Sequence, residues 1–554
     1  MIRAATIAPA RASFREATGR RRLLGLLDPG SVLELLGPAE RVTSPHLAAL
    51  GLPVAFDDGV VVAEGLLEGA PVLAASEEGG FMGGSVGEVH GAKLVGLLRR
   101  ARRLRPRGVL LLLDSGGVRL QEANSGLVAV SEVMRAVLET RADGIPVVAL
   151  VGGGWGCFGG MGIVARCCDA IAMSEEGRLG LSGPDVVEAT KGVEELDASD
   201  RALVWRTYGG KHRWILGEAD LLVDDEVGAF RAAAVELLGR PRPVSEAELA
   251  REHALLAARL ARAGGCADAA DVWRGAGTLE PARLPLLEAA AFREAAQGAR
   301  RALAAGAAPV ADPLGPGAAY RDPGIDELFP RGHAVREAGG ILRGSGRADA
   351  GEVAVVGSAG GAEVGVEAAL ALAAEVLRVV RDHPGRPLLA LVDSRGQRMS
   401  RRDELLGLNG YLGHLAGAVE LARQRGHRVI ALVRGDAVSG GVLPLGFMAD
   451  DVDALEGANP WVMALPAMAR VTKIPAERLE ELSRSSPVLA PGLDAFLRLG
   501  AIATVWRSPL DLALATALAR PREADGRAAR GLARGGRILA AAVAARVAGG
   551  DDEL

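Results

Sequence analysis

A glycine-rich turn with the features of an anion-binding site lies in residues 146–161, which read PVVALVGGGWGCFGGM. The stretch from Val147 to Val151 is apolar without alternation, as expected of a strand covered on both faces. The apolar residues from Ile163 to Cys168 predict a helix directly after the glycines. A chain that passes from a strand into a helix through glycines leaves free amide N–H groups at the helix N-terminus, where an anion or an oxyanion binds.

A second glycine turn, Asp114-Ser115-Gly116-Gly117, follows the predicted strand from Val109 to Leu113. In a parallel sheet both turns lie at the carboxyl ends of neighbouring strands, the side on which ligands usually bind. One amide from each turn would converge on a single carbonyl oxygen, which is the geometry of an oxyanion hole. We therefore predict catalytic roles for the backbone amides of Gly116, Gly117, Gly159 and Gly160.

Several basic side chains are candidates for binding the phosphates or carboxylate of a substrate. The alternative is that they lie on a solvated face, which is common for charged residues. A lone histidine, in turn, is more often a structural hydrogen-bonding group than a functional one. The predicted substrate-binding residues are Lys191, Lys211, His212, Arg213 and His90.

The order of predicted elements indicates a parallel α/β fold. Residues 59–76 form a predicted hairpin, residues 121–140 a helix between the two strands with glycine turns, and residues 14–37 two short helices. The 554 residues carry a net charge of −5, which gives no sign of nucleic-acid or membrane attraction. The four cysteines form no C-x-x-C pair, so we expect no structural metal site and a reducing, cytoplasmic location.

The second half of the chain repeats the first. Residues 388–399, LLALVDSRGQRM, align with residues 109–120, VLLLLDSGGVRL, so that Asp114 pairs with Asp393. Residues 428–443 align with residues 146–161 and pair Gly159 with Gly441, while the spacing of aligned positions grows from 279 to 282 residues. A repeat of about 280 residues is too long for a solenoid and indicates two similar domains. The predicted divisions are a first domain at 1–304, an Ala/Gly/Pro linker at 305–324 and a second domain at 325–554.

The motifs resemble the carboxyltransferase branch of the crotonase superfamily, and in particular the β subunit of biotin-independent malonate decarboxylase. The segments that carry the resemblance are GGFMGGSVGEVHGAKL, DSGGVRLQEANSGL, GCFGGMGIVARCCD, MSEEGRLGLSGP and RALVWRTYGGKHR. Residues 320–554 resemble the γ subunit through SRRDELLG, GDAVSGGVL and WVMALPAMARVT. The family's His-Ala-Met-Gly-Lys run is replaced here by Met463-Ala464-Leu465-Pro466.

The resemblance implies a fold and an activity. The fold would be two crotonase-like (ClpP/crotonase spiral) α/β domains in tandem, formed by fused β and γ subunits. The activity would be that of a carbon–carbon lyase, which converts a malonyl thioester on an acyl carrier protein to an acetyl thioester and CO2. No cofactor would be bound covalently, because a coenzyme A-derived prosthetic group of the carrier holds the substrate. The implied partners are the carrier and acyl-carrier transferase subunits, and the sequence leaves a homo-oligomer open.

Loss of CO2 from a malonyl thioester places negative charge on the thioester oxygen, and backbone amides stabilise that enolate without a metal. Gly440, Gly441 and Ser439 would form the equivalent turn in the second domain, near the carboxylate. The proton that the enolate needs would come from His90, Ser439, Tyr411 or water. One alternative is a biotin-dependent acyl-CoA carboxyltransferase, which would use the same oxyanion chemistry. Another is a scaffold that binds the carrier without catalysis.

Overall fold

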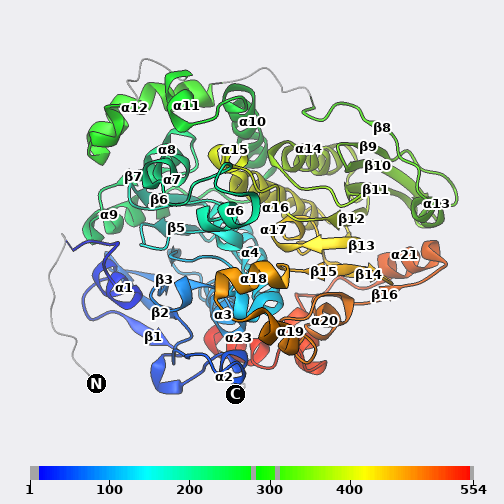
Figure 1. Ribbon diagram of the computed structural model, residues 1–554, viewed down its shortest axis with the longest axis horizontal. Helices are drawn as coiled ribbons and strands as arrows, with labels where there is room; N and C mark the ends of the chain where they lie inside the picture. The colour runs from blue at the N-terminus through cyan, green and yellow to red at the C-terminus, as the bar shows by residue number, and fades with distance from the viewer. Residues whose placement is uncertain (1–11, 276–281, 306–311, 550–554) are drawn as a thin grey trace.

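Two β-sheets, one in each half of the chain, organise the computed structural model (Figure 1), which describes residues 12–275, 282–305 and 312–549. The first sheet has seven strands in the order β1-β2-β3-β4-β5-β6-β7, antiparallel up to β3 and parallel from β3 to β7. Its strands are β1 (Leu33–Leu35), β2 (Val60–Leu67), β3 (Ala70–Glu77), β4 (Val109–Leu112), β5 (Val147–Val151), β6 (Ala170–Ser174) and β7 (Leu221–Val223).

Helices cover both faces of this sheet. Successive side chains of a strand point to opposite faces, so each strand contributes to a hydrophobic core on either side. Val109 and Leu111 belong to one hydrophobic core with residues of α3 and α4, whereas Leu110 and Leu112 belong to another with residues of α1 and α9. The first-half helices are α1 (Gly19–Leu26), α2 (Pro45–Ala49), α3 (Glu88–Leu104), α4 (Ala123–Ala142), α5 (Gly159–Cys167), α6 (Pro184–Lys191), α7 (Arg201–Tyr208), α8 (Gly210–Ile215) and α9 (Val227–Leu238), followed by α10 (Glu246–Ala263), α11 (Ala269–Gly275) and α12 (Ala289–Ala304).

The second sheet has nine strands, in the order β16-β14-β13-β12-β11-β10-β9-β8, with β15 paired to β13 beside this path. Its central strands β11 to β14 run parallel, as β3 to β7 do in the first sheet. The strands are β8 (Ala318–Ala319), β9 (Arg336–Ala338), β10 (Ile341–Ala348), β11 (Gly351–Ser358), β12 (Leu388–Ser394), β13 (Val429–Val438), β14 (Asp451–Leu455), β15 (Asn459–Trp461) and β16 (Val505–Trp506).

The inner helices of both halves share one hydrophobic core, in which α3, α4 and α5 of the first half pack with α14 and α16 of the second. Helices α13 and α21 cover the outer face of the second sheet. The second-half helices are α13 (Pro323–Leu328), α14 (Val366–Asp382), α15 (Arg401–Leu406), α16 (Leu408–Gln424), α17 (Ser439–Val442), α18 (Leu465–Thr472), α19 (Ala476–Ser483), α20 (Leu493–Arg498), α21 (Leu510–Ala519), α22 (Arg527–Ala533) and α23 (Ala540–Ala548).

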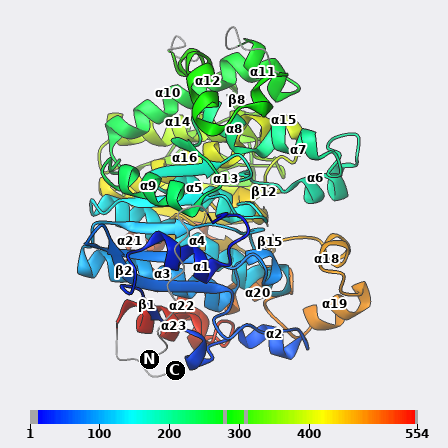
Figure 2. The ribbon, with the colours of Figure 1, turned by 90° about the vertical axis from the view of Figure 1, so that its left-hand side faces the viewer.

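Each half lends a helix to the other. Helix α10 packs against α14 and α16, while α23 near the C-terminus packs against α3 beside the N-terminal half (Figure 2). Oε1 of Glu88 on α3 accepts the N–H groups of Leu539, at 2.7 Å, and Ala540, at 3.0 Å, at the start of α23. A carboxylate at a helix N-terminus satisfies free amides and complements the helix dipole. These exchanges tie the two halves into one body.

The predicted tandem of α/β units and the hairpin at β2 and β3 are confirmed. The second of the two helices expected in residues 14–37 is wrong, because Leu33–Leu35 form edge strand β1 against β2. Residues 306–311 of the predicted linker and 550–554 of the tail lie outside the described residues. In the described parts of the chain, no helix is long and apolar enough to cross a membrane.

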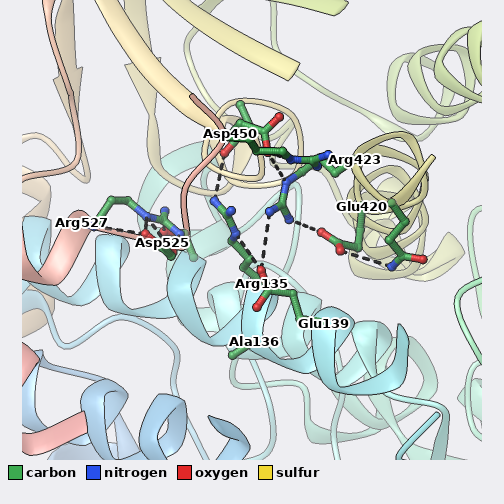
Figure 3. A network of polar contacts seen from close by, with 12 residues as sticks. Arg135, Ala136, Glu139, Glu420, Arg423, Asp450, Asp525 and Arg527 are labelled. Carbon is green, nitrogen blue, oxygen red and sulfur yellow. Dashed lines mark hydrogen bonds and ion pairs between the residues drawn. The ribbon is translucent and has the colours of Figure 1, made fainter. Parts of the chain in front are cut away.

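Buried charges join α4 to the second half of the chain (Figure 3). Arg423 on α16 lies 2.9 Å from Asp450 and 3.5 Å from Glu139 on α4, and it also pairs with Glu420. Burial disfavours a lone charge, and these carboxylates more than offset that cost, so the pKa of Arg423 is raised. Nearer the N-terminus of α4 and on the same face, Nη1 of Arg527 donates to Oγ of Ser131 at 2.7 Å.

Replacing Arg423 by methionine will destabilise the protein, because Asp450, Glu139 and Glu420 then lose a buried cation. Breaking a buried ion pair from one side costs about 3–5 kcal/mol, so the urea midpoint of unfolding will fall clearly. Arg381→Met is the matched control, since Arg381 is exposed and pairs with exposed Asp382, and such pairs contribute about 0–1 kcal/mol. If the two variants have equal urea midpoints, the buried ion-pair network does not contribute to the free energy of unfolding.

Candidate functional site between the two halves

A cavity of about 680 Å³ lies between the two halves and is lined by residues of both. It holds the ends of both glycine turns and part of α6 and α18. Of the residues predicted from sequence, the cavity lining contains Gly116, Gly159, Gly160, Lys191, Ser439 and Gly440. The two halves therefore form one common site, which neither would form alone.

Short bridges beyond the strand ends place the two turns of the first half side by side. Ser115 after β4 forms a parallel bridge with Cys157 after β5, and Val86, which follows β3, forms another with Val118. The Phe158 N–H donates to the Ser115 carbonyl at 2.9 Å. This second layer of pairing continues the sheet as a spiral and sets the start of α5 against the turn after β4.

Gly117 and Gly159 lie in direct backbone contact. A Cβ on Gly117 would lie 2.9 Å from Cα of Gly159 and 3.0 Å from the Phe158 carbonyl oxygen. Both residues also have positive φ angles, +102° and +59°, which side-chain-bearing residues rarely adopt. Glycine at both positions is therefore required for the turns to meet.

Most of the amides predicted to form the oxyanion hole already have acceptors. The Gly116 N–H donates to the Gly83 carbonyl at 2.8 Å and the Gly159 N–H to the Leu181 carbonyl at 2.6 Å. The Gly117 N–H donates to Oγ of Ser115 at 3.1 Å. These three glycines shape the turns, and their amides are not available to a substrate.

The Gly160 amide is different, because it lies in the first turn of α5, where helical N–H groups lack an intrahelical acceptor. Among the described residues, neither the Gly160 N–H nor the Val118 N–H donates to a protein acceptor. A Cβ on Gly159 would lie 3.7 Å from the Val118 nitrogen, so the Val118 amide lies beside the residue that precedes Gly160. Sequence reasoning missed Val118, because an amide donor leaves no mark on the side chain.

Three of the predicted substrate-binding residues make structural contacts instead, and two of them, His212 and Arg213, hold the halves together. His212 contacts the Leu405 carbonyl through Nε2 at 2.9 Å, and Arg213 donates to the Glu404 carbonyl at 2.8 Å. Lys211 donates to Glu175 at 2.5 Å and to the Pro285 carbonyl at 3.0 Å. All three side chains are buried and lie outside the cavity lining, which corrects their assignment to substrate binding.

His90 and Tyr411 are also buried away from the cavity. Nε2 of His90 lies 3.3 Å from Oε1 of Glu77, and burial lowers the histidine pKa while it raises the pKa of Glu77. The Tyr411 hydroxyl donates to the Leu256 carbonyl at 2.9 Å. Of the side chains predicted as proton donors, Ser439 alone lines the cavity.

The second half repeats this architecture with a corrected register. Val364 forms a parallel bridge with Gln397 as Val86 does with Val118, and the Gly396 N–H donates to Ser394 as Gly117 does to Ser115. Helix α17 begins at Ser439, as α5 begins at Gly159.

Gly159 therefore corresponds to Ser439 and Gly160 to Gly440, and the predicted pairing of Gly159 with Gly441 is wrong. The loop after Gly435 is shorter than the loop after Gly153, which shifts the register. A Cβ on Gly441 would lie 2.6 Å from the Gly396 carbonyl carbon, so this glycine serves close packing outside the cavity.

Charged and apolar groups complete the cavity. Lys191 of the first half lies 3.5 Å from Glu363 of the second, and exposed Arg395 also contributes to the lining. Met463 and Ala464, from the run that departs from the family motif, add apolar surface. The described residues contain no group of three His, Cys, Asp or Glu side chains placed to hold a metal ion.

Comparisons with known proteins match each half separately. A profile described as the malonate decarboxylase gamma subunit matches residues 359–551, and one described as a carboxyl transferase domain matches residues 15–246. The malonyl-S-ACP:biotin-protein carboxyltransferase MADC of Malonomonas rubra is 40% identical over 294 residues, which cover 49% of this chain and 92% of that protein. Its MADD counterpart is 38% identical over 120 residues, which cover 21% of this chain and 41% of that protein.

A solved structure of a Pseudomonas malonate decarboxylase hetero-tetramer in complex with malonate contains a chain that is 41% identical. The match covers 48% of this chain and 98% of that chain, with a TM-score of 0.44. The first and second halves thus match different protein families in the order that the sequence motifs indicate.

Glu404 of the second half supports the first-half turn. Its carboxylate accepts the N–H groups of Leu181, at 3.0 Å, and Ser182, at 2.7 Å, next to the Leu181 carbonyl that holds Gly159. Burial raises the pKa of Glu404 to about 7, although both amide donors and Arg213 oppose the rise. The proton that folded Glu404 retains stabilises the protein fully below pH 4.5, the ordinary pKa of a glutamate. This contribution to the free energy of unfolding is lost as the pH rises towards 7.

We expect the wild-type protein to lose stability relative to Glu404→Gln between pH 4.5 and 7, by about 3 kcal/mol in total. The sign follows because the native state holds a proton on Glu404 that the unfolded chain has released in this range. Urea midpoints of both proteins across the range will show it. A difference between the two proteins that does not change with pH would contradict the raised pKa.

Proposed function

The chain belongs to the malonate decarboxylase family, with a β-like carboxyltransferase half fused to a γ-like half, and we propose that it decarboxylates a malonyl thioester on an acyl carrier protein. The observation that carries this proposal is the pair of free amides, Gly160 and Val118, at a cavity shared by both halves. The predicted family is confirmed, and the enzyme is a carbon–carbon lyase.

The amides act on the charge that develops during the reaction. As the bond to the carboxylate breaks, its electrons move onto the thioester carbonyl, and CO2 leaves. The N–H groups of Gly160 and Val118 stabilise the resulting enolate oxygen because they are already oriented before the charge forms. A fixed donor of this kind lowers the barrier by about 3–4 kcal/mol.

The enolate carbon then takes up a proton to give the acetyl thioester. Ser439 lines the cavity, and its φ angle of +46° holds a side-chain-bearing residue in a conformation that usually requires glycine. Such strain is kept where it serves a purpose, so we assign proton delivery to the Ser439 hydroxyl together with cavity water. The hydroxyl recovers its proton from that water, and one proton is consumed in each turnover.

The substrate reaches the cavity on a carrier. We propose that a coenzyme A-derived arm on a partner acyl carrier protein enters between α6 and α18, and that no cofactor is bound covalently to this chain. A transferase subunit that loads the carrier completes the proposed complex. The relatives named above include a hetero-tetramer, which is consistent with a multi-subunit enzyme.

Transfer of the carboxyl group to a biotin protein is a second candidate function, because both Malonomonas rubra relatives are named for it. The same amides would stabilise the same enolate, but the carboxyl group would leave on biotin. Release of CO2 from malonyl-CoA, used as a soluble substrate, will be measured with and without avidin. We expect avidin to have no effect; inhibition by avidin would favour transfer to biotin.

The amide of Gly160 will be tested by a variant that removes its N–H group. Proline fits the first turn of a helix and lacks the amide hydrogen. Because a Cβ at this position meets Val130, Gly160→Pro is made in a Val130→Ala background. We expect its kcat for malonyl-CoA to fall by about 10²–10³-fold.

The matched control is Gly160→Ala in the same Val130→Ala background, which adds a Cβ but keeps the N–H group. Its kcat should stay within about tenfold of the Val130→Ala single variant, well above that of the proline variant. Thermal melts of all three proteins will show whether they fold. If the folded proline variant turns over as fast as the alanine variant, the Gly160 amide has no role.

A further inference from the structure

Equivalent positions in the two halves fall into two groups. The residues that build the turns are the same, since Asp114, Ser115 and Gly117 correspond to Asp393, Ser394 and Gly396. Three pairs of residues that face the cavity differ, and at these three positions the second half is more polar. There Gly116 becomes Arg395, Val118 becomes Gln397, and Gly159 becomes Ser439.

Gln397 changes what the second turn offers to a ligand. Its Oε1 accepts the Gly440 N–H at 3.1 Å. The corresponding N–H, on Gly160, is free because Val118 has no acceptor in its side chain. The second half therefore cannot present the amide that we assign to the enolate in the first half.

The hydrogen bond also fixes the orientation of the Gln397 carboxamide. An amide N–H needs an acceptor, so the oxygen faces Gly440 and the NH2 group faces elsewhere. Gln397 lines the cavity with 8% of its surface exposed, and its Nε2 has no protein acceptor among the described residues. The NH2 group is thus a donor available to a molecule in the cavity.

A neutral donor suits a carboxylate that must leave as CO2. The substrate carboxylate loses its charge in the transition state, so strong ground-state binding by a cation would raise the barrier. An amide holds and orients the carboxylate with less stabilisation of its charge. The charged alternatives, Lys191 and Arg395, are exposed, and Lys191 pairs with Glu363.

We infer that Gln397 binds the malonyl carboxylate through its side-chain NH2 group. The Gly440 N–H holds Oε1 of Gln397 and so fixes the orientation of this side chain. This inference rests on the proposed function, because it requires a malonyl thioester in the cavity. The two halves then divide the substrate between them, with the thioester oxygen on first-half amides and the carboxylate on second-half side chains.

Two variants separate the role of the Gln397 NH2 donor from that of the Gln397 oxygen, which accepts the Gly440 N–H. Gln397→Glu keeps an acceptor for the Gly440 N–H but has no NH2 group, and Gln397→Met removes both. We expect each variant to raise the KM for malonyl-CoA about ten- to a hundredfold, as for a lost hydrogen bond to a charged group. The Ki of acetyl-CoA, which lacks the carboxylate, should stay within about twofold in both, since a bond to the carboxylate contributes nothing to its binding.

A structural role would weaken malonyl-CoA and acetyl-CoA alike, and that result would overturn the inference. Arg395→Met is the matched control, and a selective loss of malonyl-CoA binding in that variant alone would move the carboxylate site to Arg395. If the wild-type protein binds malonyl-CoA but releases no CO2, the proposed function fails. Calorimetric binding of the two thioesters to Gln397→Met would then still test the role of Gln397.

Discussion

The close approach of two backbone turns is the constraint on which the site depends. Two amides can stabilise one oxygen only if their nitrogens lie within about 3 Å of it, so the turns that carry them must touch. Gly117 and Gly159 satisfy this requirement by contact without side chains, at a separation that would place a Cβ 2.9 Å from a neighbouring Cα. Acceptors within the protein occupy the amides of Gly116, Gly117 and Gly159, whereas among the described residues those of Gly160 and Val118 have none.

The same contact explains why the two halves must be held firmly together. The first-half turn depends on Leu181, whose amide is held by Glu404 of the second half. Arg213 in turn binds the Glu404 carbonyl, and His212 binds the next one along the chain. His212 and Arg213, which the sequence analysis predicted to bind substrate, therefore support the site indirectly. They fix the Glu404 segment, which in turn holds Leu181 under the first-half turn. A fused chain keeps these contacts intramolecular and so spares the entropy of bringing two subunits together.

Much of the fold followed from local pattern, whereas the site followed only in part. The apolar stretch from Val147 to Val151 and the paired Asp114 and Asp393 predicted the strands, the turns and the repeat, because burial and turn geometry depend on residue type. The register of the second glycine turn did not follow, since a loop shortened by a few residues shifts Gly441 out of the site without changing its composition. The free Val118 amide and the buried places of Lys211 and Arg213 depend on tertiary contacts, which a linear sequence does not display.

The differences between the halves carry the chemical meaning of the repeat. A symmetrical pair of oxyanion holes would suit a reaction in which two carbonyl oxygens become negative. Decarboxylation makes only one oxygen more negative and removes charge from the other end of the substrate, so two identical holes would stabilise the wrong state at that end. The hydrogen bond from Gly440 to Gln397 withdraws one hole from use, and Ser439 places a hydroxyl where the first half has only Gly159. The scaffold residues Ser115 and Ser394 keep the same bond in both halves, so a few cavity-facing side chains are enough to give a duplicated fold two unlike ends.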